Sequence, residues 1–237
     1  MRARRLLVVG APGNVGQGIV VEALAAGRQV IAADRDSAAL TRLAARHQGQ
    51  DLASVVGDIG TEAGAVALWD EATRPLGGID AVLVAISVIG KVQPLVEWSA
   101  LDLSANLSSN VLVHFIAAKI FLPRLPADGL LLGIGGGTAD FIIPKMAHIS
   151  IAQAAQRMLY QGLARERREG AEARELMIVS MVNGEATRDR AKPDWVTDRD
   201  VGRHVCAILD DPGRFPGPVM RLMSREQVGQ PEPTVRS

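Results

Sequence analysis

The sequence contains little of several residue types that mark particular classes of protein. A single cysteine, Cys206, excludes an internal disulfide and is typical of a reducing compartment. The 26 basic and 26 acidic residues balance, so the composition indicates neither a nucleic-acid partner nor a strongly charged substrate. Aromatic residues make up 3% of the chain, so we expect a core of Ala, Val, Leu and Ile.

The chain also lacks a long apolar run near its start. Arg2, Arg4 and Arg5 precede an apolar stretch that ends at Gly10, which is too short for a signal peptide or a membrane span. We therefore expect a cytoplasmic protein without membrane contact, and we predict no metal site. The 237 residues suffice for one large α/β domain, which we place at residues 1–223. We expect residues 224–237, rich in Pro, Gly and polar residues, to be a disordered tail.

Residues 6–20 carry the strongest pattern in the chain. An apolar run ends at Gly10, a turn with glycines at 10, 13 and 16 follows, and an amphipathic segment begins. This order predicts the strand, turn and helix that open a dinucleotide-binding βαβ unit. Gly10 would allow the tight turn, Gly13 the approach of a phosphate, and Gly16 close packing of helix and strand. A turn that binds no ligand is the alternative.

An acidic residue follows the turn at the distance that this motif requires. Asp34 ends the next apolar run, 29–33, roughly 20 residues after the glycines. Its carboxylate would accept hydrogen bonds from the adenosine ribose hydroxyls and would repel a 2′-phosphate, which favours NAD over NADP. The neighbouring Arg35 points the other way, because an arginine can pair with a phosphate or stack on adenine. Asp34 could also serve as a helix N-cap.

Apolar strands and amphipathic helical segments alternate through the rest of the chain. We predict helices over 17–27, 38–46 and 62–74, and strands over 53–56 and 79–85. The alternation predicts a Rossmann-like, doubly wound parallel sheet flanked by helices, in three αβα layers.

From Leu6 to about Met223 the chain resembles a short-chain dehydrogenase/reductase. The turn at 10–16 is similar to the Gly-x-x-Gly-x-x-Gly form of the family's glycine motif, and Asp58-Ile59 matches its adenine-holding pair. Residues 129–134 match the fifth strand, 177–184 the sixth and 217–222 the last. The resemblance implies a cofactor site whose residues are Gly10, Pro12, Gly13, Asn14, Val15, Gly16, Asp34, Arg35, Asp58, Ile59, Ala85 and Ser87.

The catalytic residues of the family are where the resemblance fails. The family uses Tyr-x-x-x-Lys on one helical face, but four residues after the only tyrosine, Tyr160, stands Ala164. Alignment of the helix places Ile149 at the tyrosine position and Gln153 at the lysine position; a shift by one residue places His148 and Ala152 there instead. The serine position falls in the glycines 135–137. Only Asn110 matches, and its alternative role is to stabilise a helix kink by bonding backbone.

Other side chains near these positions are candidates for the missing chemistry. His148 stands beside the lost tyrosine position and could exchange a proton near neutral pH, or it could simply sit at a helix start. The remaining candidates are Lys145 in the preceding loop, Thr138 near the lost serine, and Gln153 as a partner for a ribose hydroxyl.

A cofactor motif without the family's catalytic residues is compatible with three functions. The first is a divergent oxidoreductase that transfers hydride between NAD(H) and a small carbonyl or hydroxyl substrate. The second is a catalytically inactive NAD(P)-binding sensor or regulatory protein. The third is a non-redox isomerase or lyase that relies on His148 and Lys145. The small residues Ala152, Ala154 and Ala155 stand on a helix that family members use to pair subunits, so we expect a homodimer or homotetramer.

Overall fold

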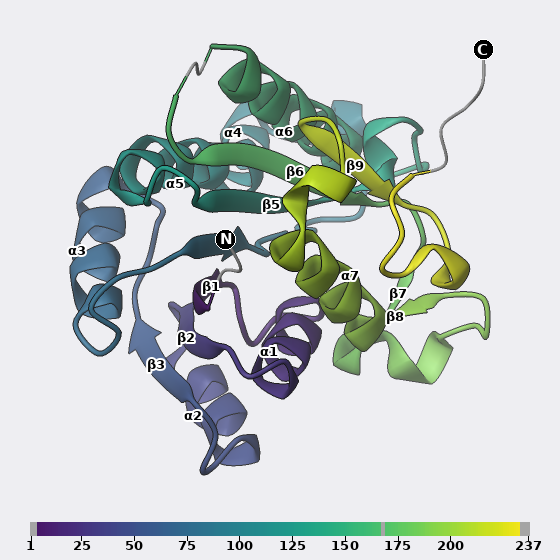
Figure 1. The fold of residues 1–237 in the computed structure, drawn as a ribbon. Coiled ribbons are helices and arrows are strands. Elements are labelled where there is room, and N and C mark those ends of the chain that lie inside the picture. The colour runs from purple at the N-terminus through teal and green to yellow at the C-terminus, as the bar shows by residue number, and fades with distance from the viewer. Residues whose placement is uncertain (1–3, 167–168, 233–237) are drawn as a thin grey trace.

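The structure, a computed structural model, describes residues 4–166 and 169–232 (Figure 1). Its centre is a seven-stranded parallel sheet in the order β3-β2-β1-β4-β5-β6-β9. The strands are β1 (Arg5–Val9), β2 (Gln29–Asp34), β3 (Leu52–Val56), β4 (Ala81–Val84), β5 (Leu130–Gly136), β6 (Glu172–Ile178) and β9 (Val219–Leu222). The short strands β7 (Val182–Asn183) and β8 (Val196–Thr197) pair separately, also in parallel.

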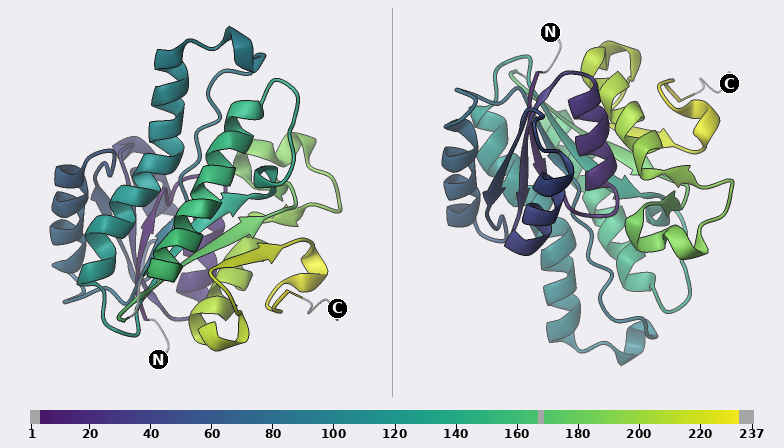
Figure 2. Two further views of the ribbon diagram at one scale, coloured as in Figure 1. Left: turned by 90° about the horizontal axis from the view of Figure 1, so that it is seen from above. Right: turned by 90° about the horizontal axis from the view of Figure 1, so that it is seen from below.

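Helices cover both faces of this sheet, as the two further views show (Figure 2). The helices are α1 (Gly16–Ala25), α2 (Ser37–Arg46), α3 (Glu62–Thr73), α4 (Ala100–Leu107), α5 (Val113–Phe121), α6 (Ala147–Glu166) and α7 (Asp198–Asp210). A π-helical turn, Ser108–Leu112, joins α4 to α5, and short 3-10 turns follow several elements. The predicted three-layer, Rossmann-like fold is confirmed.

The alternation of side chains along the strands explains the two apolar layers. Leu6 and Val8 of β1 face the cluster formed with α1, α2 and α7. Leu7 and Val9 face the cluster formed with α3, α5 and α6. Because parallel strands are covered on both faces, nearly every residue of β1 and β4 is apolar and buried.

The longest apolar helical stretch belongs to this core. Residues Ala100–Arg124 are long and apolar enough to cross a membrane by length and composition alone, but 56% of the most apolar window is buried against the protein. Within this stretch the π turn surrounds Asn110, so the helix is distorted where the sequence predicted that an asparagine could stabilise a kink.

The sixth strand was predicted at the wrong place. β6 begins at Glu172 and ends at Ile178, whereas the sequence suggested residues 177–184. The first half of β6 carries Glu172, Arg174 and Glu175. Because these residues interrupt the apolar pattern, the sequence does not mark this part as a buried strand. Residues 182–183 form β7 instead.

Candidate cofactor and active site

A cleft of about 400 Å³ opens at the carboxyl ends of the central strands. It lies where the strand order changes direction between β1 and β4, which is where ligands bind in open α/β sheets. Eight of the predicted cofactor-binding residues line it: Gly10, Gly13, Asp34, Arg35, Asp58, Ile59, Ala85 and Ser87.

The glycine turn forms the floor of this cleft. Gly10 has φ +78°, a conformation that suits glycine, and its N–H donates to Ala33 O at 2.9 Å. A Cβ on Gly16 would lie 2.2 Å from Gly10 O, so the start of α1 can approach the turn only with glycine there. The N-cap residue, Val15, makes no side-chain hydrogen bond to the first turn of α1. That helix end therefore offers N–H groups to an anion.

The outer side of the turn contacts the segment after β7. Asn14 Oδ1 accepts a hydrogen bond from the Ala186 N–H at 3.0 Å. Glu185 receives two hydrogen bonds from Arg46 of α2, at 2.8 and 3.0 Å, and this ion pair lowers the pKa of Glu185 to about 2. Pro12 and Asn14 line a second, smaller cavity beside this contact, while Val15 packs against the apolar core. Of the predicted turn residues, Gly10 and Gly13 thus line the cleft, whereas Pro12 and Asn14 lie beside the segment that follows β7.

The acidic residues of the cleft hold their own loops in place. Asp34 Oδ1 accepts from the Asp36 N–H at 2.9 Å, and Asp36, not Asp34, caps α2. Asp58 Oδ1 accepts from the Gly60 N–H at 2.8 Å, and the neighbouring Ile59 is buried. The alternative N-cap role for Asp34 is therefore wrong, and its carboxylate lines the cleft.

Two of the predicted catalytic residues converge on the loop that follows β4. Asn110 is buried, accepts from the Val88 N–H at 2.8 Å and donates to Val88 O and Asn106 O at 2.9 Å. His148 has no exposed surface; its Nε2 lies 2.6 Å from Ile89 O and its ring stacks 4.3 Å from that of Trp98. In this conformation both side chains bind the backbone of the cleft wall, and neither residue is among those that line the cleft.

Of the other predicted catalytic residues, Gln153 and Thr138 both lie beside Gly136 at the end of β5. Gln153 is buried, and its Oε1 accepts from the Gly136 N–H at the end of β5. Thr138 lies in the 3-10 turn after β5 and is half-buried. Lys145 is exposed and has φ +66°, the only positive φ at a non-glycine residue in the described part of the chain. Gln153 is thus bound to backbone beside Thr138, whereas Lys145 lies in the loop that precedes α6.

A buried polar cluster that the sequence did not reveal is formed by residues of α5, α6 and β6. It comprises His114, Gln156, Tyr160 and Glu175, none more than 1% exposed. His114 Nδ1 lies 3.0 Å from Tyr160 Oη, and Gln156 Nε2 donates to Ile134 O at 3.1 Å. Both carboxylate oxygens of Glu175 are without a hydrogen-bond partner in the described residues.

The glycines of β5 leave room for this cluster. A Cβ on Gly133 would lie 2.3 Å from Tyr160 Oη, and one on Gly135 would lie 2.1 Å from Glu175 Oε1. Burial raises the pKa of Glu175 to about 8, and the positive charge of Arg157 offsets this only in part. Burial likewise lowers the pKa of His114 to about 4. These glycines were the one sequence signal that could have revealed the cluster.

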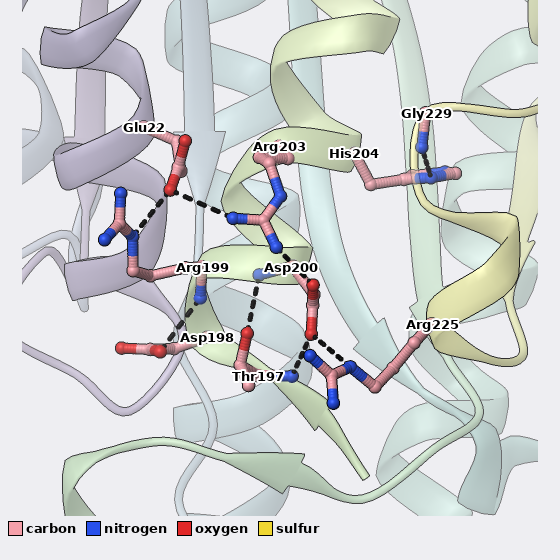
Figure 3. A network of polar contacts seen from close by, with 9 residues as sticks. All are labelled: Glu22, Thr197, Asp198, Arg199, Asp200, Arg203, His204, Arg225 and Gly229. Atoms are coloured by element: carbon pink, nitrogen blue, oxygen red, sulfur yellow. Dashed lines mark hydrogen bonds and ion pairs between the residues drawn. The ribbon is translucent and has the colours of Figure 1, made fainter. Parts of the chain in front are cut away.

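The segment after β9 packs against α7 and is not a disordered tail as far as residue 232. Arg225 Nε donates to the buried carboxylate of Asp200 at 3.1 Å, and the Gly229 N–H donates to His204 Nδ1 at 3.2 Å (Figure 3). Burial alone would raise the pKa of Asp200, but hydrogen bonds from Thr197 and the charge of Arg225 hold it below its usual value. Gln227 is also buried and binds the backbone of Arg221 and Met223. The rest of the predicted tail, 233–237, lies outside the described residues.

Comparisons with known proteins agree with this geometry. A family profile described as enoyl-(acyl carrier protein) reductase matches residues 10–174. A 1-deoxy-11-beta-hydroxypentalenate dehydrogenase of Streptomyces exfoliatus is 29% identical over 168 residues, which are 65% of this chain and 61% of that protein. The chain therefore spans less than two thirds of the length of this relative.

Solved structures share the fold over nearly the full length. A 7 alpha-hydroxysteroid dehydrogenase complexed with NADH and 7-oxo glycochenodeoxycholic acid has a TM-score of 0.81 at 18% identity and covers 92% of each chain. A short chain dehydrogenase/reductase from Burkholderia phymatum in complex with NAD has a TM-score of 0.76 at 18% identity, over 88% of this chain and 86% of that one.

Proposed function

Because the chain belongs to the short-chain dehydrogenase/reductase family, we propose that it binds NAD(H) in the cleft and transfers a hydride between the nicotinamide and a small carbonyl or hydroxyl substrate. The observation that carries this proposal is the meeting of the glycine turn, Asp34 and the Asp58-Ile59 pair in one cleft. When bound, the nicotinamide would supply the hydride acceptor or donor.

The cleft residues fit a dinucleotide. The N-terminus of α1, which has no side-chain cap, suits a pyrophosphate, and Gly13 lines the cleft without a side chain. The Asp34 carboxylate suits the two ribose hydroxyls and disfavours a 2′-phosphate, so NAD is the preferred cofactor and NADP the weaker one. Arg35 beside it is exposed and can stack on the adenine.

The proton that balances hydride transfer does not come from the family's tyrosine. Tyr160, a residue of α6, is fully buried, and Asn110, His148 and Gln153 are bound to backbone. We assign this proton to water, which would give it to the carbonyl oxygen in reduction and take it from the substrate hydroxyl in oxidation; Ser87, Ser108 and Ser109 line the cleft nearby.

A second candidate is a protein that binds NAD(H) without turnover. The backbone bonds of Asn110, His148 and Gln153 favour it, because they occupy three of the side chains that could have served in catalysis. The third hypothesis, a non-redox isomerase or lyase, loses its support from His148, whose ring is buried against Trp98.

Absorbance at 340 nm separates these functions. We expect the wild-type protein to oxidise NADH steadily with at least one member of a panel of ketones and aldehydes. NADH binding without oxidation by any of them would contradict hydride transfer and favour the binding protein. His148→Asn and Asn110→Ala serve as variants of the cleft wall. Both are expected to weaken NADH binding, because each side chain holds the backbone of that wall in place.

We also propose that the chain forms a homodimer or homotetramer in the cytoplasm. An apolar groove of about 620 Å³ lies between α4, α5 and α6, lined by Leu107, Leu112, Phe115 and Leu159 among others. Ala152 is buried inside the subunit, so the small-residue face predicted from the sequence contributes only through the half-buried Ala154 and Ala155. Sedimentation should show a dimer or tetramer that Phe115→Glu converts to a monomer.

A further inference from the structure

Helix α6 is attached to the sheet mainly by polar side chains. It packs against β5, β6 and β9 (Figure 1). Of its residues, all of which the structure describes, only Tyr160 belongs to an apolar cluster of the core, and the half-buried Leu163 packs against that cluster. Its other buried side chains are those of His148, Ile149, Ser150, Ala152, Gln153 and Gln156. Burial of apolar surface therefore contributes less to the docking of α6 than to that of α5, whose buried residues are apolar except for His114.

Two of these polar side chains bind the strand at the centre of this contact. Gln153 Oε1 accepts from the Gly136 N–H at the end of β5. Gln156 Nε2 donates to Ile134 O of the same strand at 3.1 Å. Movement of α6 away from the sheet would therefore release the carboxyl end of β5.

The first turns of α6 also hold the segments beside the cleft. His148 Nε2 lies 2.6 Å from Ile89 O, and residues 85–88, which precede Ile89, line the cleft. Ser150 Oγ donates to Phe141 O at 2.8 Å. The docking of α6 and the position of the cleft wall are thus linked by hydrogen bonds.

The side chain of Glu175 lies between β5 and this polar face of α6. A Cβ on Gly135 would lie 2.1 Å from Glu175 Oε1 and 3.2 Å from Gln156 Nε2, so both side chains occupy space that the glycine leaves. Neither oxygen of Glu175 has a hydrogen-bond partner among the described residues, and the same holds for Gln156 Oε1. A neutral carboxyl can donate to Gln156 Oε1 after a small rotation, whereas a carboxylate cannot donate at all.

The charges around Glu175 do not stabilise its ionised form. The ionisable groups that face it from the elements packed around it are Arg157 and Tyr160 of α6, Arg221 of β9 and, through Tyr160, His114 of α5. Both arginines pair with Asp140, and β5 presents only glycines here. Burial raises the pKa of Tyr160 and lowers that of His114 to about 4, so both are neutral at pH 7. Burial also outweighs the arginines and raises the pKa of Glu175 to about 8.

We propose that Glu175 is a pH-sensitive switch for the docking of α6: the neutral carboxyl holds the helix on β5, and the ionised one releases it and loosens the cleft wall. A buried carboxylate without hydrogen bonds must be hydrated. Because β5 and β9 are joined to β6 by main-chain hydrogen bonds, α6 is the element that moves to admit water. The link to the cofactor rests on the proposed function, since the released form would bind NADH less tightly.

Hydrogen exchange of the free protein tests the switch, because the Gly136 amide is bound by a side chain of α6. Its protection factor, corrected for the intrinsic effect of pH on exchange, gives the opening constant of α6. The open form, with an ordinary carboxyl pKa, binds fewer protons than the docked form, so this constant rises with pH and levels off above about pH 8. From pH 6.5 to pH 8.5 it should rise about 25-fold.

The amides of β1 serve as the internal reference, because they exchange through global unfolding. The Gly136 amide should exchange faster than these amides and should depend little on low concentrations of urea, as expected for a local opening. Exchange of Gly136 only together with β1, at the same rate and with the same urea dependence, would overturn the switch.

Two variants identify the group that titrates. In Glu175→Gln the protection of Gly136 should no longer change with pH, whereas the matched control Glu172→Gln, exposed on the same strand, should keep the wild-type profile. If Glu175→Gln does not fold, Glu175→Met takes its place, because methionine fills similar space without an ionisable group. A flat profile in the wild type, or an unchanged profile in the variant, would refute the proposal.

NADH tests the link to the cleft. At 100 times its dissociation constant, NADH should raise the protection of the Gly136 amide about 100-fold, because only the docked form binds tightly. Binding of NADH that leaves this protection unchanged would overturn the link. Failure of the proposed function is a separate result, since NADH then binds at no pH while the free protein still shows its pH profile of exchange.

Discussion

Replacing Glu175 with glutamine should stabilise the protein at alkaline pH. The pKa of this buried carboxyl is raised from its usual 4.5 to about 8, so the folded state holds the proton that the unfolded state releases. Stability from this group is therefore present at low pH and is lost as the pH rises from about 4.5 to about 8. At about 1.4 kcal/mol per pH unit, the wild type should lose roughly 2 kcal/mol between pH 6.5 and pH 8.5.

Urea unfolding at several pH values in this window measures the effect. Glutamine has nearly the shape of glutamate, and its amide can donate to Gln156 Oε1, which has no partner among the described residues. Glu175→Gln should therefore remove most of the pH dependence and exceed the wild type in stability at pH 8.5. The matched control is Glu172→Gln, which changes an exposed carboxylate of the same strand. Identical pH dependence in Glu175→Gln and the wild type would refute the reasoning.

Three further predictions concern buried contacts in three parts of the fold. Gly133→Ala should lower the free energy of unfolding by about 1–3 kcal/mol, because its Cβ would overlap Tyr160 Oη, and urea unfolding checks this. Asn110→Ala should speed hydrogen exchange at the Val88 amide and cost about 1–3 kcal/mol of stability; unchanged exchange would show that the clamp is dispensable. Burial lowers the pKa of His204 to about 4, so its stabilising contribution is present above pH 6.5 and is lost as the pH falls toward 4. Acid should then loosen the Gly229 amide first, as exchange at pH 7 and pH 4.5 would reveal.

The features that the sequence predicted correctly depend on local patterns. Apolar runs such as 6–9 and 81–84 are buried on both faces, so composition alone marks them as strands of a parallel sheet. The glycine turn is local as well, since the φ of Gly10 and the contact of Gly16 with Gly10 arise within seven residues. The distance from this turn to Asp34 then places both groups at the same sheet edge.

The features that the sequence missed depend on contacts between distant residues. β6 was misplaced because it carries Glu175, a buried ionisable side chain whose environment is formed by α6 and β5. Residues 224–232 have the composition of a disordered segment, but Arg225 and Gly229 find partners on α7 that the sequence does not show. The sequence likewise does not show the direction of the His148 ring. Because this ring contacts Ile89 O and Trp98, the residue belongs to the cleft wall and is no longer the candidate acid.

The measurement that tests the central claim most directly is calorimetric titration with NADH and, separately, NADPH. The wild type, Asp34→Ala and Asp36→Ala are compared, because Asp36 caps α2 two residues away and is not among the residues that line the cleft. We predict micromolar NADH binding by the wild type, weaker NADPH binding, at least tenfold loss in Asp34→Ala and little change in Asp36→Ala. Binding of neither dinucleotide, or equal NADH affinity in the wild type and Asp34→Ala, would contradict the assignment of this cleft to NAD(H).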